Sequence, residues 1–155
     1  MRYFLVLVLL FGLLSVSPAR GGDITPSSKD RCPVCGMFVA KYPNFLASIK
    51  FKDGTSVFFD GPKDMFKYYF DIKKYSPSRQ QSDITAIYVK DYYTLKPIDA
   101  YKATYVTGSD INGPMGRELI PFESEADAKA FMNDHNGKAL MKFKNVTSAF
   151  VKTLN

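Results

Sequence analysis

The spacing of apolar residues changes twice in the first half of the chain, which separates two expected strands from an expected helix. Residues 45–51 place apolar side chains at every second position, and 56–59 repeats this more briefly, so both segments are predicted strands. Asp53-Gly54 between them predicts a tight hairpin turn. From Asp60 onward the apolar spacing becomes helical, with Met65, Phe66, Tyr69 and Phe70 on one face. This Met and aromatic face is the pattern of a buried helix face, not of a cofactor site. Asp60 is the expected cap of this helix and Pro62 suits its first turn.

The second half of the chain repeats the order of strands and helix. After a polar connection over 71–83, the pattern predicts strands at 85–93, 100–107, 118–122 and 139–143. Ser124 predicts the start of a helix that ends near His135, and a closing helix is expected over 146–154. A glycine-rich loop is expected over 108–116.

A weak internal repeat follows from these elements. In both 58–66 and 121–128 a strand that ends in Phe leads into a helix that opens with acidic residues. The sequence therefore predicts an α+β fold of two small related ββαβ modules with antiparallel sheets and a C-terminal helix. We expect the modules at about 31–83 and 84–155.

The first thirty residues do not fit that fold. A positive start at Arg2 is followed by an apolar run over 3–16 and by small residues at Ser17 and Ala19, which is typical of a secretory signal peptide, 1–19. An uncleaved N-terminal anchor is the alternative. Residues 20–30 are then a flexible leader. The first cysteine after the apolar run is Cys32, so no lipobox cysteine is present, and we expect a soluble exported protein without a membrane span in its mature chain.

Charge and cysteine content exclude some classes of function. The net charge is +6, but the lysines are scattered instead of forming a stripe, so an exported protein of this kind is not expected to bind nucleic acid. A basic surface that docks an acidic partner is the simpler interpretation. Two cysteines are too few for a disulfide scaffold, and the many Phe and Tyr residues must supply the core.

The chemistry of the chain centres on Cys32-Pro33-Val34-Cys35-Gly36-Met37. This segment holds both cysteines in a C-x-x-C pair and adds a thioether after one glycine. Soft sulfur donors favour Cu(I), and thiolates also favour Zn(II). Gly36 permits a sharp turn that aims the three sulfur atoms at one point.

Three other interpretations of this motif remain open. An export compartment is oxidising, so Cys32 and Cys35 can form a plain disulfide. A thioredoxin-type catalyst normally has its C-x-x-C at a helix start beside a βαβ unit, whereas here two hairpin strands follow. A zinc site normally has a second C-x-x-C or a pair of histidines, and the sequence has neither.

Met115 favours copper among these possibilities. It lies between Pro114 and Gly116 in the expected loop, where an apolar side chain either fills a gap or serves as a ligand. A thioether binds Cu(I) well and Zn(II) poorly. His135, the one histidine, is better explained by its place at a helix C-terminus than by a ligand role.

Two segments together resemble the NosL family, accessory proteins of nitrous oxide reductase in denitrification. The first segment is Cys32 to Val39 followed by Tyr42-Pro43-Asn44, and the second is Pro114 to Phe122 followed by an Ala-rich helix and Asn136-Gly137. The resemblance covers most of the mature chain in the expected order. It implies two related ββαβ modules and a periplasmic Cu(I) chaperone, not an enzyme.

Carried over by position, the resemblance implies four sulfur ligands for Cu(I): Cys32, Cys35, Met37 and Met115. The implied partner is apo nitrous oxide reductase or another periplasmic copper protein. Many members of the family are tethered by a lipidated cysteine, which this sequence lacks. The alternative function is a periplasmic thiol-disulfide redox protein that uses the C-x-x-C pair, and a third is a docking module whose cysteines form an inert disulfide.

Overall fold

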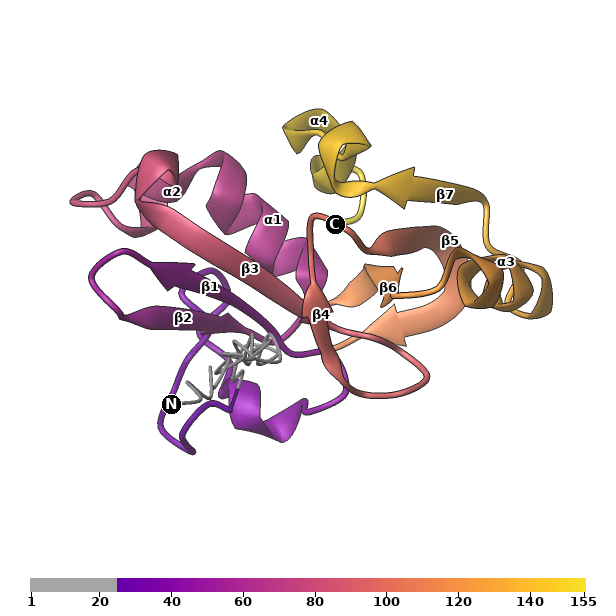
Figure 1. The fold of residues 1–155 in the computed structure, drawn as a ribbon, viewed down its shortest axis with the longest axis horizontal. Coiled ribbons are helices and arrows are strands. Elements are labelled where there is room, and N and C mark those ends of the chain that lie inside the picture. The colour runs from indigo at the N-terminus through magenta and orange to yellow at the C-terminus, as the bar shows by residue number, and fades with distance from the viewer. Residues whose placement is uncertain (1–24) are drawn as a thin grey trace, which may run out of the picture.

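The computed structural model describes residues 25–155, and two antiparallel sheets with four α-helices make up this part of the chain (Figure 1). The predicted signal peptide, 1–19, and the first part of the expected leader lie outside the described residues. Within the described part, no helix is long and apolar enough to cross a membrane. The expected α+β class with antiparallel sheets is confirmed.

The first sheet has the strand order β2-β1-β3-β4 and the second has the order β6-β5-β7. In the first sheet β1 pairs with both β2 and β3, and α1 and α2 lie between β2 and β3 in sequence. In the second sheet β5 pairs with both β6 and β7, and α3 lies between β6 and β7 in sequence. The strands are β1 (Ala47–Phe51), β2 (Ser56–Phe59), β3 (Ile84–Lys90), β4 (Pro97–Asp99), β5 (Thr104–Gly113), β6 (Gly116–Phe122) and β7 (Ala139–Lys142). The helices are α1 (Pro62–Phe70), α2 (Ile72–Tyr75), α3 (Glu125–Asp134) and α4 (Ser148–Lys152), with short 3-10 turns at Val39–Lys41, Gln81–Asp83 and Phe143–Asn145.

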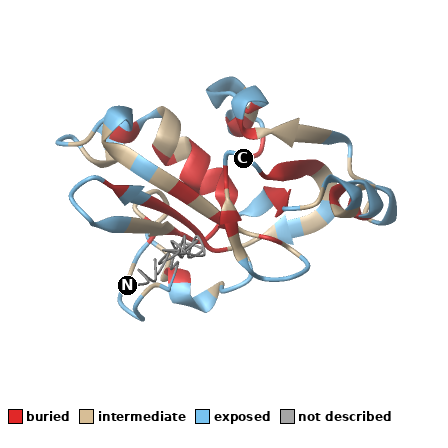
Figure 2. Ribbon diagram, viewed as in Figure 1, coloured by how far each residue is buried: buried red, intermediate tan, exposed pale blue. Residues whose placement is uncertain are grey.

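Helix α1 joins the two sheets through a shared core. Met65 and Phe66 are fully buried, as the apolar spacing predicts, whereas Tyr69 and Phe70 are half-buried. The Phe66 ring lies 5.5 Å from the Tyr105 ring of β5. Buried positions gather along α1 and along the strand segments that approach it (Figure 2). The helix that contacts the first sheet is therefore also packed against the hairpin of the second sheet.

A smaller core lies under α3. It consists of Val106, Ile120, Phe122, Ala128 and Phe131, which pack the helix onto β5 and β6. The predicted cap of α3 is confirmed, because the Ser124 side chain accepts a hydrogen bond from the Asp127 amide at 3.2 Å.

Three segments differ from the sequence prediction. The expected turn at 94–99 contains the short strand β4, which pairs with β3 through Ile98 opposite Val89. The expected loop at 108–116 is the end of a long hairpin, because β5 continues to Gly113 and pairs it with Gly116. The sequence places the boundary between modules near residue 83, whereas β3 pairs with β1, so the first sheet continues past this position. The division into two modules stays a prediction.

Candidate metal centre

The C-x-x-C segment forms a small closed loop. The Cys32 amide donates to the Met37 carbonyl at 2.9 Å, and the Gly36 amide donates to the Cys32 carbonyl at 2.8 Å. Gly36 has φ of +79°, a conformation that glycine adopts without strain. The Arg31 guanidinium donates to the Gly36 carbonyl at 2.9 Å and braces the loop from outside. The loop thus holds both thiols on one side, and it is not the helix start that a thioredoxin-type motif needs.

Each thiol faces a carboxylate of the α1 N-terminal region. Cys32 is buried and Cys35 is half-buried, and both are free thiols. Cys35 Sγ donates to Asp60 Oδ1 at 3.2 Å, and Cys32 Sγ donates to Asp64 Oδ2 at 3.5 Å. One donor atom from each of these four residues lies within 4.8 Å of the others. The group is therefore a compact set of two sulfur and two oxygen donors.

The two carboxylates lie at the start of α1, Asp60 just before the helix and Asp64 in its first turn. Asp64 is in the first turn, where the helix dipole favours negative charge, and Lys67 pairs with it at 3.2 Å. Asp60 precedes the N-cap residue Gly61, and no side chain caps this helix. The prediction that Asp60 caps α1 is therefore wrong, because its carboxylate accepts from the Cys35 thiol instead.

Burial holds both thiols in the protonated form. Loss of solvent raises the pKa of Cys35 to about 12, with its neighbours Asp60 and Asp64 adding to the effect. The same cause raises the pKa of the more deeply buried Cys32 still further. A metal ion that binds here must displace these protons, because the thiolate is the ligand.

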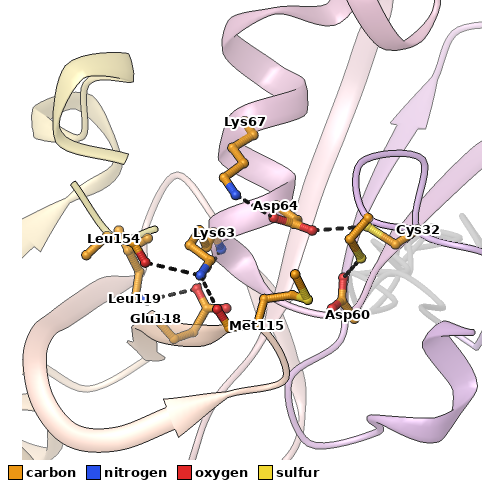
Figure 3. Close-up of polar contacts among 10 residues, drawn as sticks. Cys32, Asp60, Lys63, Asp64, Lys67, Met115, Glu118, Leu119 and Leu154 are labelled. Atoms are coloured by element: carbon orange, nitrogen blue, oxygen red, sulfur yellow. Dashed lines mark hydrogen bonds and ion pairs between the residues drawn. The ribbon is translucent and has the colours of Figure 1, made fainter. Parts of the chain in front are cut away.

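Met115 lies at the tip of the β5–β6 hairpin and is brought to the start of α1. The buried Lys63 ammonium donates to the Met115 carbonyl at 2.5 Å and to the Leu154 carbonyl at 3.3 Å. Figure 3 shows the Met115 side chain extended from the hairpin toward Asp60, on the side of α1 where Cys32 lies. The side chain is 43 % exposed. The hairpin tip that carries Met115 thus contacts the start of α1, which also contacts the two thiols, and the set of four sulfur ligands stays a prediction.

Glu118 links the β5–β6 hairpin to the start of α1 through its buried carboxylate. Its carboxylate accepts from the amides of Lys63 at 2.6 Å and Leu119 at 2.9 Å. Burial raises the pKa of Glu118 and lowers the pKa of Lys63. Gly61 lies directly against Glu118, and a Cβ at that position would overlap the carboxylate. The hairpin tip and the start of α1 are thus fixed to each other by buried polar contacts.

Met37 and His135 are the other two residues that the sequence analysis considers as ligands. Met37 is half-buried, and its carbonyl closes the cysteine loop. His135 caps the C-terminus of α3, as expected from its position, and its ring pairs with Asp110 at 3.0 Å. His135 is not part of the donor group found among the described residues.

Four residues of this region were missed by sequence reasoning: Asp60, Asp64, Lys63 and Glu118. Asp60 and Asp64 do carry a signal, since they are two acids close together at a predicted helix start. Lys63 and Glu118 carry none, because their contact joins positions 55 residues apart.

The fold and the donor group define a class: an α+β protein with a candidate metal centre between a cysteine loop, a helix start and a hairpin tip. A model of the NosL family matches residues 23–151, and the chain belongs to this family.

Individual relatives are also similar to the chain. The chain is 30% identical over 131 residues to the copper-binding lipoprotein NosL of Stutzerimonas stutzeri, in a match that covers 79% of this chain and 65% of that relative. It is similar to the crystal structure of the copper chaperone NosL from Shewanella denitrificans, with a TM-score of 0.68 and 27% identity over 86% of this chain and 99% of that one. The solution structure of apo-NosL from Achromobacter cycloclastes is 30% identical, with a TM-score of 0.47 over 68% of this chain and 87% of that one.

Proposed function

We propose that this protein is a periplasmic Cu(I) chaperone that binds the ion through Cys32, Cys35 and Met115, with Met37 as a further sulfur donor. The observation that carries the proposal is the position of the Met115 hairpin, held by Lys63 beside the helix turn whose carboxylates contact both thiols. Cu(I) selects thiolate and thioether ligands. Two relatives are named as copper-binding or copper chaperone proteins, which supports the same cargo here.

Exposure sets the order in which ligands are exchanged. Met115 is the exposed donor, Cys35 is half-buried and Cys32 is 1% exposed. A thioether carries no charge and binds more weakly than a thiolate, so Met115 is the first ligand that an acceptor displaces. Cys35 follows, and Cys32 holds the ion until the acceptor has taken it. The ion passes through shared ligation and is never free.

The acceptor is apo nitrous oxide reductase or another periplasmic copper protein. This assignment follows from the resemblance of the two sulfur segments and from the predicted signal peptide over 1–19. The protein acts as a carrier and not as an enzyme, because metal exchange changes no covalent bond of a substrate.

Cu(I) competition against a chromophoric chelator tests the proposal. The reduced protein should bind one Cu(I), and Cys32→Ser and Cys35→Ser should each lose most of the affinity, by at least about 100-fold. Met132→Ala, a methionine change on α3, is the control and should leave the affinity unchanged. Serine variants that bind as tightly as the parent would remove the claim.

The free C-x-x-C pair also suggests thiol-disulfide exchange as a second function. The raised pKa of both thiols argues against it, because exchange needs a thiolate near neutral pH. Turnover in an insulin reduction assay that does not depend on Met115 would favour this function over copper transport.

A further inference from the structure

A surface groove of about 580 Å³ lies between the cysteine loop, the C-terminal half of α1, α2 and α4. Val34, which separates the two cysteines in sequence, lines this groove, and so do Lys67 and Phe70 of α1. None of the four residues of the donor group lines it, so the groove is a neighbour of the candidate metal centre and not a part of it. Its volume falls in the range of ligand-binding clefts, roughly 300–1,000 Å³.

Three lysines line the groove, and two of them have no ion-pair partner among the described residues. Lys67 pairs with Asp64 at 3.2 Å, whereas Lys74 of α2 and Lys152 of α4 are exposed and unpaired. Asp71 is the one acidic side chain in the lining. The lining side chains therefore carry an excess of positive charge, which favours an anionic occupant.

Apolar side chains form the less exposed part of the lining. Val34, Phe70 and Tyr75 are half-buried and Val151 is buried. The Lys74 ammonium lies 5.1 Å from the centre of the Tyr75 ring, so an exposed cation borders an aromatic surface. An apolar centre with a charged rim is the usual arrangement of a surface that binds a protein segment.

We propose that this groove docks an acidic segment of the protein that receives the ion. Carboxylates of the segment bind Lys74 and Lys152, and an apolar side chain between those carboxylates packs on the apolar lining. The inference rests on the proposed function, because it assigns a binding surface to the acceptor. A flat anionic membrane suits this surface less well, because the groove is concave and includes Asp71.

Lys67 connects the groove to the thiols. It lines the groove and pairs with Asp64 Oδ1, while Asp64 Oδ2 accepts a hydrogen bond from the Cys32 thiol at 3.5 Å. A carboxylate that binds Lys67 in the groove is therefore separated from this buried thiol by one ion pair and one hydrogen bond. Val34 places the same groove beside Cys35, the more exposed of the two thiols. Docking here brings the acceptor to the first thiolate that the proposed exchange releases.

Cu(I) transfer to a synthetic acceptor peptide tests this surface. The peptide carries a reduced C-x-x-C pair and two glutamates on either side of a phenylalanine, and a second peptide has glutamines in place of the glutamates. The Cu(I)-loaded parent should transfer the ion to the acidic peptide at least about tenfold faster at low salt, and this advantage should shrink as salt rises. Lys74→Glu/Lys152→Glu should abolish the advantage. Lys50→Glu/Lys96→Glu changes the net charge equally at exposed positions outside the groove and is the matched control, which should keep the advantage.

Backbone amide chemical shifts locate the docked peptide. The acidic peptide should shift the amides of Val34, Lys67, Lys74 and Lys152 in the parent. Equal transfer to the two peptides, an advantage that survives in Lys74→Glu/Lys152→Glu, or shifts confined to other surfaces would each overturn the inference. Binding of anionic phospholipid vesicles at these lysines in place of the peptide would also overturn it.

Cu(I) competition titration separates this inference from the proposed function. Lys74→Glu/Lys152→Glu should bind Cu(I) as tightly as the parent does, because neither lysine contacts the donor group. A parent protein that binds no Cu(I) would refute the chaperone function itself. A parent that binds Cu(I) through its cysteines but does not distinguish the two peptides would refute only the docking groove.

Discussion

The Lys63 ammonium donates a hydrogen bond to the backbone carbonyl of Met115, 52 residues further along the chain, at 2.5 Å. This contact ties the start of α1, where Asp60 and Asp64 face the thiols, to the hairpin tip that carries the thioether. Because Lys63 is 1% exposed, water does not compete effectively for the contact. The side chain that fixes the hairpin is therefore a positioning residue for the proposed third sulfur ligand.

Lys63→Met should weaken Cu(I) binding through its effect on Met115. Loss of the anchor frees the hairpin tip, and we expect a loss of about tenfold in Cu(I) affinity, comparable to other supporting contacts of metal ligands. Competition titrations of Lys63→Met, Met115→Ala and the double variant measure the coupling.

In the double variant, the lysine change should have no further effect on affinity, since the ligand that it positions is absent. Lys129→Met, which breaks an exposed pair with Glu125, is the control and should bind as the parent does. Independent, additive losses would show that Lys63 acts on the site by another route.

Gly61→Ala should destabilise the protein because its methyl group would overlap the Glu118 carboxylate. The backbone of Gly61 is extended, with φ of −168°, so the cost is steric and not conformational. We expect the free energy of unfolding to fall by about 1–3 kcal/mol, as for other overpacked sites. Urea unfolding measures it. In a Glu118→Ala background the same change should cost much less, and an equal cost there would contradict the steric explanation.

Asp91 should stabilise the joint between the β3–β4 loop and β6. Its carboxylate accepts from the amides of Thr94 and Glu123, both at 2.7 Å, and of Tyr93 at 3.1 Å. Burial alone would raise the pKa of Asp91, but these hydrogen bonds outweigh it and lower the pKa. Asp91→Ala leaves buried donors unpaired and should cost about 2–4 kcal/mol in the free energy of unfolding.

The lowered pKa of Asp91 determines how its contribution to stability depends on pH. A carboxyl with a lowered pKa in the folded state contributes stability above its unfolded pKa of about 3.9 and loses it as pH falls through the folded pKa. The difference in stability between the parent and Asp91→Ala should therefore shrink on acidification. A difference that stays constant down to strongly acidic pH would mean that the carboxylate charge is not what stabilises the joint.

Local pattern predicted most of the elements of this fold, because each depends on near neighbours in sequence. The Asp53-Gly54 turn, the Ser124 cap and the closing helix α4 follow from the residues that form them. The sequence predicts the paired parts of β5 and β6 but gives their far end as a loop, because its glycines are typical of a loop, whereas Gly113 and Gly116 pair across the turn. Strand β4 was missed because Pro97 and its three-residue length are typical of a turn.

The sequence predicts only part of the candidate metal site, because the site depends on contacts between residues that are far apart in the chain. The sulfur residues are recognisable by type, and both the position of Met115 in its loop and the family resemblance predict that it joins the two cysteines. The predicted role of Asp60 is wrong because an acid before Gly-Pro is a typical helix cap. Only the fold shows that the Asp60 carboxylate accepts a hydrogen bond from the Cys35 thiol instead of capping the helix. Lys63 lies on the predicted helix as a charged residue, which gives no reason to expect its burial between two sheets.

Cu(I) binding should strengthen with pH because both thiols are held protonated. Burial raises the pKa of Cys35 to about 12 and that of Cys32 further, so each thiolate ligand requires the release of a proton at neutral pH. If two protons leave, the apparent affinity rises by up to about 100-fold per pH unit between about pH 6 and 8. In Cys35→Ser the slope should fall to about tenfold per unit. An affinity that does not change with pH would contradict ligation by these thiols.

The most direct test is X-ray absorption of the reduced, Cu(I)-loaded protein beside Met115→Ala at the same loading. The number of sulfur neighbours around copper should fall by one in the variant, because the hairpin held by Lys63 no longer supplies a thioether. An unchanged sulfur count in Met115→Ala would show that the hairpin tip does not bind the ion, and the proposed convergence of the two segments on Cu(I) would be wrong.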